Sequence, residues 1–385
     1  MFHEAISPTQ ESNEKKGHPG NTAVVRKPVI SKIGAEMEYA GVEITYKNGN
    51  SMRKNKILRT MDHGAKLVAD TDHVEFVTKE TSDSRLFYET IEAGRQALLE
   101  FYNYAVDSAK EKRPATNPPD IKIKAPDGNR LPWIRPQVTI EIKKDTLPQF
   151  HEAIQKGSVQ YRHAYTYNQT THEFNKLENK RLATYSKLIQ EDMQKAFANI
   201  PVSGEFTENA VAFAKLTVFL LLCLYHNCPA NYIKARLPIM PRTSLKSMYQ
   251  AMPEEEQRQY RTLIFKMGQP FWSLRIPDWE HDNYAIANKG NDNPQEYNIL
   301  HILNSIWYNL PKFTKAGSSA PADILSSDVF NSGGDVGASI GALPLPAGAA
   351  GVFEIRGMPP VQVTSKDEVH DVYEDVINHY GKSAE

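Results

Sequence analysis

Residues 33–39 have the sequence IGAEMEY, in which polar and apolar side chains alternate. Successive side chains of a β-strand point to opposite faces of the sheet. One face of such a strand would therefore carry Glu36 and Glu38, and the opposite face would carry only apolar side chains. This stretch predicts a strand with one face toward a core and two carboxylates on the other.

Three further stretches have the composition of strands in which polar and apolar residues alternate. They are residues 67–77, 137–142 and 352–356. By the same alternation, Gln137 lies on the polar side of the second stretch, and Glu354 and Arg356 lie on that of the third. In the first stretch Asp70 and Glu75 differ in parity, so we expect a bulge or a strand end between them.

Carboxylates recur on the polar stripes of these strands. They are Glu36, Glu38, Glu75 and Glu354. A single polar stripe is ordinarily the solvated face of a half-buried sheet. Four polar stripes together, three of which carry these carboxylates, favour a site for cations, because like charges at cross-strand distance repel each other unless cations lie between them. Carboxylate oxygens are the ligands that Mg²⁺ prefers, and paired metal ions serve phosphoryl transfer. Arg356 would then stabilise the charge on the transferred group.

A basic segment, residues 233–249, follows the most apolar stretch of the chain. It contains Lys234 and Arg242, and residues 242–244 open a predicted helix, where backbone N–H groups favour anions. Two interpretations stay open at this point: a clamp for a phosphate group, and a solvated basic turn. Elsewhere the sequence lacks the glycine-rich loop motif GxxxxGK[ST] that cradles nucleotide phosphates.

The order of elements predicts an α+β fold, with strands toward both ends of the chain and helices between them. Helical spacing covers residues 84–106, 147–197, 208–226 and 367–380, and a further helix is expected after Pro253. We expect a disordered leader over residues 1–27 and a single catalytic domain over residues 28–385. Within that domain we expect a helical insertion over about 147–312 and a mobile loop over about 315–350.

The composition limits the classes of partner. The chain has 45 Lys and Arg residues against 46 Asp and Glu residues, so it has no overall field that would steer it to nucleic acid or to a membrane surface. The apolar stretch 210–225 is too short to span a bilayer and contains Lys215. Neither Cys223 nor Cys228 has zinc-site spacing, and both are expected to be reduced thiols. We expect no nucleic acid partner and no membrane insertion.

The segments GAEMEY, VADTDHVEFVT, PQVTIEI and VFEIRG occur in the chain in this order. Together they resemble the carboxylate–amine ligases of the glutamine synthetase and glutamate–cysteine ligase superfamily. Within it, the chain length, the helical insertion and the segment LPIMPRTS look most like the actin cross-linking effector domains of multifunctional RTX toxins and type VI secretion spike proteins. The resemblance implies an antiparallel sheet funnel of the glutamine-synthetase type, with ATP and Mg²⁺ as cofactors. It further implies a secreted effector, delivered into the host cell cytosol, that joins a glutamate of one actin to a lysine of another.

The resemblance also assigns roles. The metal set would be Glu36, Glu38, Glu75 and Glu354; the nucleotide would be bound by Gln137, Lys234, Arg242 and Arg356; and the catalytic set would be Glu36, Glu38, Glu75, Gln137, Glu354 and Arg356. The His-x-His-like element of small-molecule ligases is not evident, which favours a protein substrate over free glutamate.

Two other functions compete with this one. The first is a small-molecule ATP-dependent carboxylate–amine ligase of the glutamate–cysteine ligase type. The second is a noncatalytic scaffold whose acidic strands bind Ca²⁺ or face solvent. In the ligase mechanism a base must take a proton from the incoming ammonium. Glu75, Glu141 and Asp72 are all candidates for that base, and the sequence does not choose among them.

Overall fold

The computed structural model of this chain combines one large, mainly antiparallel sheet with helices, so the predicted α+β class is confirmed. It describes residues 29–39, 41–107, 110, 112–114, 121–124, 133–156, 159–163, 191–198, 200, 205–227, 239–268, 343–355 and 358–383. The predicted leader, Cys228, Lys234 and Arg356 lie outside these residues. The predicted funnel shape stays a prediction.

The main sheet has the strand order β3-β4-β5-β1-β7-β9-β8. These strands are β3 (Lys56–Thr60), β4 (Lys66–Asp70), β5 (His73–Val77), β1 (Val29–Tyr39), β7 (Trp133–Lys143), β9 (Ala349–Ile355) and β8 (Ile239–Pro241). The short strand β10 (Val361–Gln362) pairs with β7, and the short strand β11 (Lys382–Ser383) pairs in parallel with β1. Strands β2 (Glu43–Tyr46) and β6 (Ile121–Lys124) form a second sheet. Neighbouring strands along the main order pair antiparallel.

The stretch 67–77 forms a hairpin of two strands, which explains its broken alternation. β4 ends at Asp70 and β5 begins at His73, and these two residues are direct partners in the ladder. The turn between them contains Thr71, whose φ is +60°. A two-residue turn places the residues on either side of it on the same sheet face. Asp70 therefore shares a face with Glu75, which a continuous strand would not allow.

The stretch predicted to be helical over residues 147–197 is interrupted, since the helix that begins at Leu147 ends at Gln155 and residues 159–163 are not helical. The helices otherwise begin and end close to where the sequence predicts them. They are α1 (Ser84–Val106), α2 (Leu147–Gln155), α4 (Glu208–Asn227), α5 (Leu245–Gln250), α6 (Glu254–Gly268) and α8 (Lys366–Tyr380). Asp83 accepts a hydrogen bond from the Leu86 amide to cap α1, and Thr207 caps α4 through the Ala210 amide. None of the described helices is both long and apolar enough to cross a membrane.

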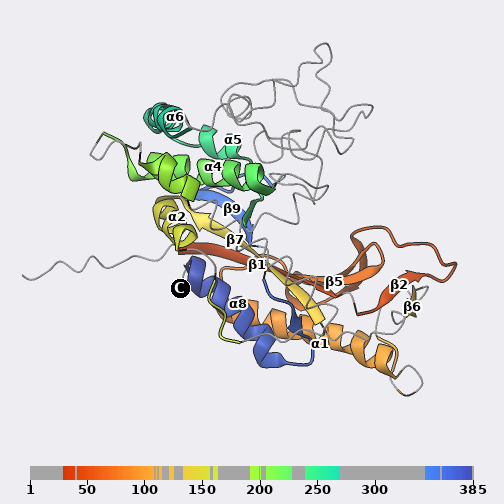
Figure 1. Ribbon diagram of the computed structural model, residues 1–385. Coiled ribbons are helices and arrows are strands. Elements are labelled where there is room, and N and C mark those ends of the chain that lie inside the picture. Colours follow the sequence, from red (N-terminus) through yellow and green to blue (C-terminus); the bar gives the residue numbers. More distant parts are fainter. Residues whose placement is uncertain are drawn as a thin grey trace, which may run out of the picture.

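Helices α1 and α8 lie side by side against the apolar face of the sheet (Figure 1). Gly94 lets α1 come close to β5, since a Cβ atom at this position would lie 2.4 Å from the Phe76 ring. From α8, the fully buried Tyr373 donates a hydrogen bond to the backbone oxygen of Glu36, at 2.8 Å. The core is therefore on this face, and the polar stripes lie on the other.

The described part of the predicted helical insertion is not entirely helical. It contains α2, α4, α5 and α6, but residues 239–241 form the edge strand β8, which pairs with β9. The sequence does not predict this strand, because prolines lie on both sides of Ile239 and Met240 and proline is disfavoured within strands. In the predicted mobile loop, residues 315–342 lie outside the described residues, and β9 already begins at Ala349.

Candidate active site

The strand register brings the predicted carboxylates onto one face of the main sheet. Glu38 of β1 is the direct partner of Glu75 of β5, and Glu36 is the direct partner of Gln137 of β7. On the far side of β7, Thr139 pairs with Glu354 of β9. Directly opposed residues of an antiparallel ladder point to the same face. Of the residues predicted from the sequence, Glu36, Glu38, Glu75, Gln137 and Glu354 thus share one face, which we call the carboxylate face.

Asp70 and Lys54 join this face, although the sequence did not single them out. Asp70 is brought beside Glu75 by the β4–β5 hairpin, and Lys54 forms an ion pair with it, Nζ to Oδ1, at 2.9 Å. The sequence signal that would have found Asp70 is the dipeptide turn Thr71-Asp72, once it is recognised as a hairpin. Lys54 carries no comparable signal, because it comes from a separate turn before β3.

The electrostatics of the carboxylate face are unfavourable for anions. Burial, and after it the charges of Glu36, Asp70 and Glu38, raise the pKa of Glu75 to about 8, against the opposing charge of Lys54. Arg135 is the ladder partner of Glu38, and its Nη1 lies 3.9 Å from Glu38 Oε2. The raised pKa of Glu75 reflects burial together with nearby negative charge, so this part of the face favours a proton or a metal cation.

Gln137 adds an unsatisfied acceptor to the same face. Its Oε1 atom is buried and has no hydrogen-bond partner within the described part of the chain. Buried polar atoms of native proteins are almost always paired, so an unpaired one is a candidate contact for a ligand or an ion. Its ladder partner is Glu36, which places this acceptor among the carboxylates.

Glu354 and Arg242, predicted for different roles, form an ion pair with each other. Arg242 Nη1 donates to Glu354 Oε2 at 2.7 Å. The Glu354 side chain is 1% exposed and the Arg242 side chain 12% exposed. Arg242 reaches it because β8 pairs with β9, with the Arg242 amide bonded to the Val352 oxygen. The short charge-assisted bond fixes the guanidinium at one end of the carboxylate face.

The other two candidates for the general base are held by their neighbours. Glu141 accepts a hydrogen bond from Ser31 Oγ at 2.7 Å and lies 3.5 Å from Lys32 Nζ. Asp72 lies in the β4–β5 turn, 2.6 Å from His73 Nδ1. Of the three candidates, Glu75 is the one surrounded by the other carboxylates.

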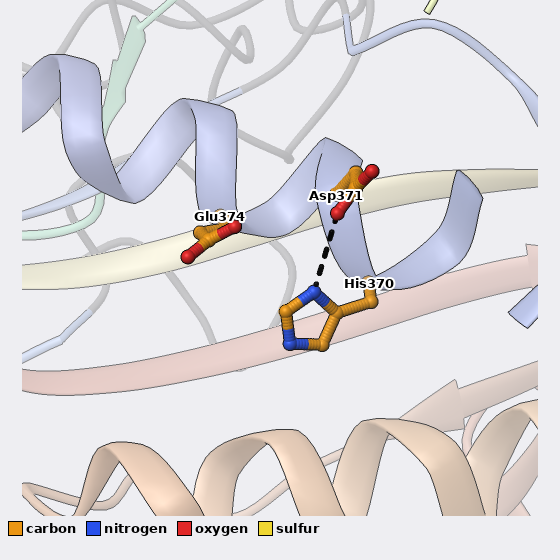
Figure 2. A group of neighbouring side chains, drawn as sticks. All are labelled: His370, Asp371 and Glu374. Carbon is orange, nitrogen blue, oxygen red and sulfur yellow. Dashed lines mark hydrogen bonds and ion pairs between the residues drawn. The ribbon is translucent and has the colours of Figure 1, made fainter. Parts of the chain in front are cut away.

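A second acidic group lies on α8, where His370, Asp371 and Glu374 come close together (Figure 2). Arg162 donates hydrogen bonds to Asp371 and Glu374, and His163 Nε2 lies 2.6 Å from Asp371 Oδ2. The guanidinium thus already occupies the place that a cation would take between these carboxylates. We interpret the group as an ion-pair network that holds residues 159–163 on α8.

No protein-family model and no curated protein matches this chain. Two solved structures are similar to it. One is a mutant of the ACD domain of a Vibrio cholerae VgrG toxin in complex with ADP and Mn²⁺, with a TM-score of 0.36, 12% identity, and coverage of 92% of this chain and 98% of that chain. The other is a Vibrio cholerae toxin from the MARTX/VgrG family, with a TM-score of 0.36, 13% identity, and coverage of 86% and 95%. Both are described as Vibrio cholerae toxins of the VgrG or MARTX/VgrG type, the group of toxins that the sequence motifs resemble. Similarity at this level transfers neither the fold nor the activity of those toxins.

Proposed function

We propose that this chain is an ATP- and Mg²⁺-dependent carboxylate–amine ligase that joins a glutamate of one actin to a lysine of another by an isopeptide bond. The observation that carries the proposal is the carboxylate face, on which acidic residues of four strands point the same way. These strands are β4, β5, β1 and β9, and β7 lies between β1 and β9. The sequence resemblance supplies the reaction class. We also propose that the chain acts as a secreted effector inside a host cell.

The donor set of the face fits a divalent cation. Glu36, Glu38, Glu75 and Asp70 offer hard carboxylate oxygens of the kind that Mg²⁺ prefers. Burial is the main cause of the raised pKa of Glu75, and the charges of Glu36, Asp70 and Glu38 raise it in the same direction. Gln137 contributes a buried oxygen to which no residue in the described part of the chain donates a hydrogen bond. A cation bound here would offset the charge repulsion between a carboxylate substrate and a triphosphate.

The residues of this chain divide into two groups by position. Glu36, Glu38, Glu75 and Gln137 would hold the cation near the middle of the sheet. Arg242, fixed by Glu354, would face the phosphate groups from the β8 side, where a guanidinium binds phosphate oxygens by two parallel hydrogen bonds. Lys234 and Arg356 keep the nucleotide-binding roles that the resemblance assigns them.

The proposed reaction has two steps. In the first, an oxygen of the substrate glutamate attacks the γ-phosphorus of ATP; an O–P bond forms, the bond to the leaving oxygen breaks, and ADP departs. In the second, the lysine nitrogen attacks the acyl carbon, the C–O bond breaks and inorganic phosphate leaves. The lysine ammonium gives up its proton to a base, for which Glu75 is the candidate nearest the other carboxylates. The products are an amide, ADP and phosphate.

The test is a denaturing gel of purified actin incubated with this protein, ATP and Mg²⁺. We expect a ladder of covalent actin oligomers that requires ATP. A Glu36→Gln, Glu38→Gln variant should give no ladder, whereas a matched Glu89→Ala, Glu255→Ala variant should give the wild-type ladder, because both of its residues are exposed and lie on helices.

Two results would contradict the proposal. An equal ladder from the Glu36→Gln, Glu38→Gln variant would show that the carboxylate face is not the active site. The absence of any ladder, together with ATP consumption that requires glutamate and a small amine, would assign the chain to the small-molecule ligases instead.

A further inference from the structure

Lys54 brings a positive charge to the Asp70 end of the carboxylate face. Its ammonium lies 2.9 Å from Asp70 Oδ1, and about half of its side chain is exposed. Burial alone would lower the pKa of Lys54, but its hydrogen bond to Asp70 and the charges of Asp70, Glu75 and Glu36 raise it overall. The ammonium therefore stays charged and interacts with the same carboxylates that would bind a metal.

The backbone holds Lys54 in this place. The next residue, Asn55, donates its amide hydrogen to the backbone oxygen of Ala69 in β4 at 2.7 Å. Asn55 adopts the left-handed conformation, with φ at +63°, which asparagine tolerates better than most residues. On the other side, Met52 is buried in the core. The turn that carries Lys54 is thus hydrogen-bonded to β4, the strand that ends at Asp70.

We infer that Lys54 is a resident counter-cation, which neutralises part of the carboxylate face in the metal-free protein and competes there with a divalent cation. This inference rests on the metal-dependent function proposed above. A cation that takes Asp70 as a ligand must displace the ammonium, and the displacement reduces its net gain in binding energy. A nucleotide brings negatively charged phosphate groups, with which the displaced ammonium can form an ion pair. Lys54 would therefore make metal binding depend on nucleotide binding.

Lys56 offers a matched control two residues further along the chain. Its ladder partner is Ala69, so it points to the face opposite Asp70. Its Nζ lies 4.2 Å from the centre of the Tyr46 ring. Loss of this lysine removes the same charge from the same strand region, but not from the carboxylate face.

The experiment measures the binding of Mn²⁺ alone to the intact chain by electron paramagnetic resonance, without nucleotide. We expect Lys54→Met to tighten Mn²⁺ binding roughly tenfold, since repulsion between a half-exposed ammonium and a bound cation at this range weakens binding by about that factor. Lys54→Arg, which keeps the charge, and Lys56→Met should both bind Mn²⁺ as the wild type does. With ADP present, the difference between wild type and Lys54→Met should shrink.

The outcomes separate this inference from the proposed function. Mn²⁺ binding that is lost in Glu36→Gln, Glu75→Gln but unchanged in Lys54→Met would overturn the role of Lys54 and leave the metal site standing. Equal tightening in Lys54→Met and Lys56→Met would also overturn it, because the effect would then be one of overall charge. Mn²⁺ binding that does not respond to Glu36→Gln, Glu75→Gln would refute the metal site itself, and the inference with it.

Discussion

Glu38 of β1 and Glu75 of β5 are direct cross-strand partners in the antiparallel ladder. Like charges in this position destabilise a sheet, and the cost rises where the surroundings exclude water. Burial and the nearby charges raise the pKa of Glu75 to about 8, because they disfavour the charged form of this carboxyl group. The stability of the sheet should therefore depend on protons and on cations.

The first prediction concerns pH. The pKa of Glu75 is raised from 4.5 to about 8 in the folded chain, so between these values the folded state binds more protons than the unfolded state. The stabilising contribution of this proton is complete below about pH 4.5 and is lost as the pH rises through about 8. Chemical denaturation without divalent metal should show a free energy of unfolding that falls across this window by up to a few kcal/mol. Glu75→Gln should remove most of that slope, and Glu255→Gln, at an exposed position of α6, should not.

The second prediction concerns metal ions. A cation that binds the folded carboxylate face and not the unfolded chain stabilises the fold by mass action. At pH 8, millimolar Mg²⁺ should raise the midpoint of thermal unfolding of the wild type. The shift should be smaller at pH 5, where protons compete for Glu75, and absent in Glu36→Gln, Glu38→Gln. A wild-type shift that persists in this variant would place the bound ion elsewhere.

The third prediction concerns the pair of Arg242 and Glu354. Removal of one partner of a buried ion pair typically costs about 3–5 kcal/mol. Arg242→Met and Glu354→Gln should each destabilise the chain on this scale, and the double variant should be destabilised by clearly less than the sum of the two. Denaturant unfolding of all four proteins gives the coupling energy, which we expect at about 1–3 kcal/mol. Additive effects would show that the two side chains act independently.

The fourth prediction concerns the contact between α1 and the sheet. Gly94→Ala improves helix propensity, but its new methyl group would meet the Phe76 ring at 2.4 Å. The overlap should outweigh the propensity gain and destabilise the chain by about 1–3 kcal/mol. Ala93→Ser, on the exposed side of the same helix, is the control and should have little effect. If Phe76→Leu is added, part of the lost stability should return.

Local patterns predicted those elements whose signals are contained within a short stretch. The strand at Glu36 and Glu38 follows from strict alternation, and α1 follows from helical spacing, with the same bounds in sequence and structure. The edge strand β8 was missed, because three residues beside prolines show neither signal. Its existence depends on its partner β9, which is distant in the sequence, and such pairing leaves no local trace.

For the candidate site, the alternation placed Glu36, Glu38, Gln137 and Glu354 on the polar side of their strands, and the structure has them on one face. Alternation gives the side of each strand but not the order of strands, so the ion pair of Arg242 with Glu354 could not be foreseen. Asp70 and Glu75 differ in parity, and the strand end expected between them is confirmed, but the sequence did not show that a hairpin there brings both onto one face. The role of each residue remains a prediction.

The strand order has a consequence for how the chain is made. β7 pairs with β1 on one side and with β9 on the other, and β9 lies near the C-terminal end of the 385 residues. During translation, helices such as α1 can form early, whereas the β7–β9 ladder must wait until β9 has left the ribosome. Until then Arg242 has no Glu354 to bind, and the carboxylate face lacks its last strand.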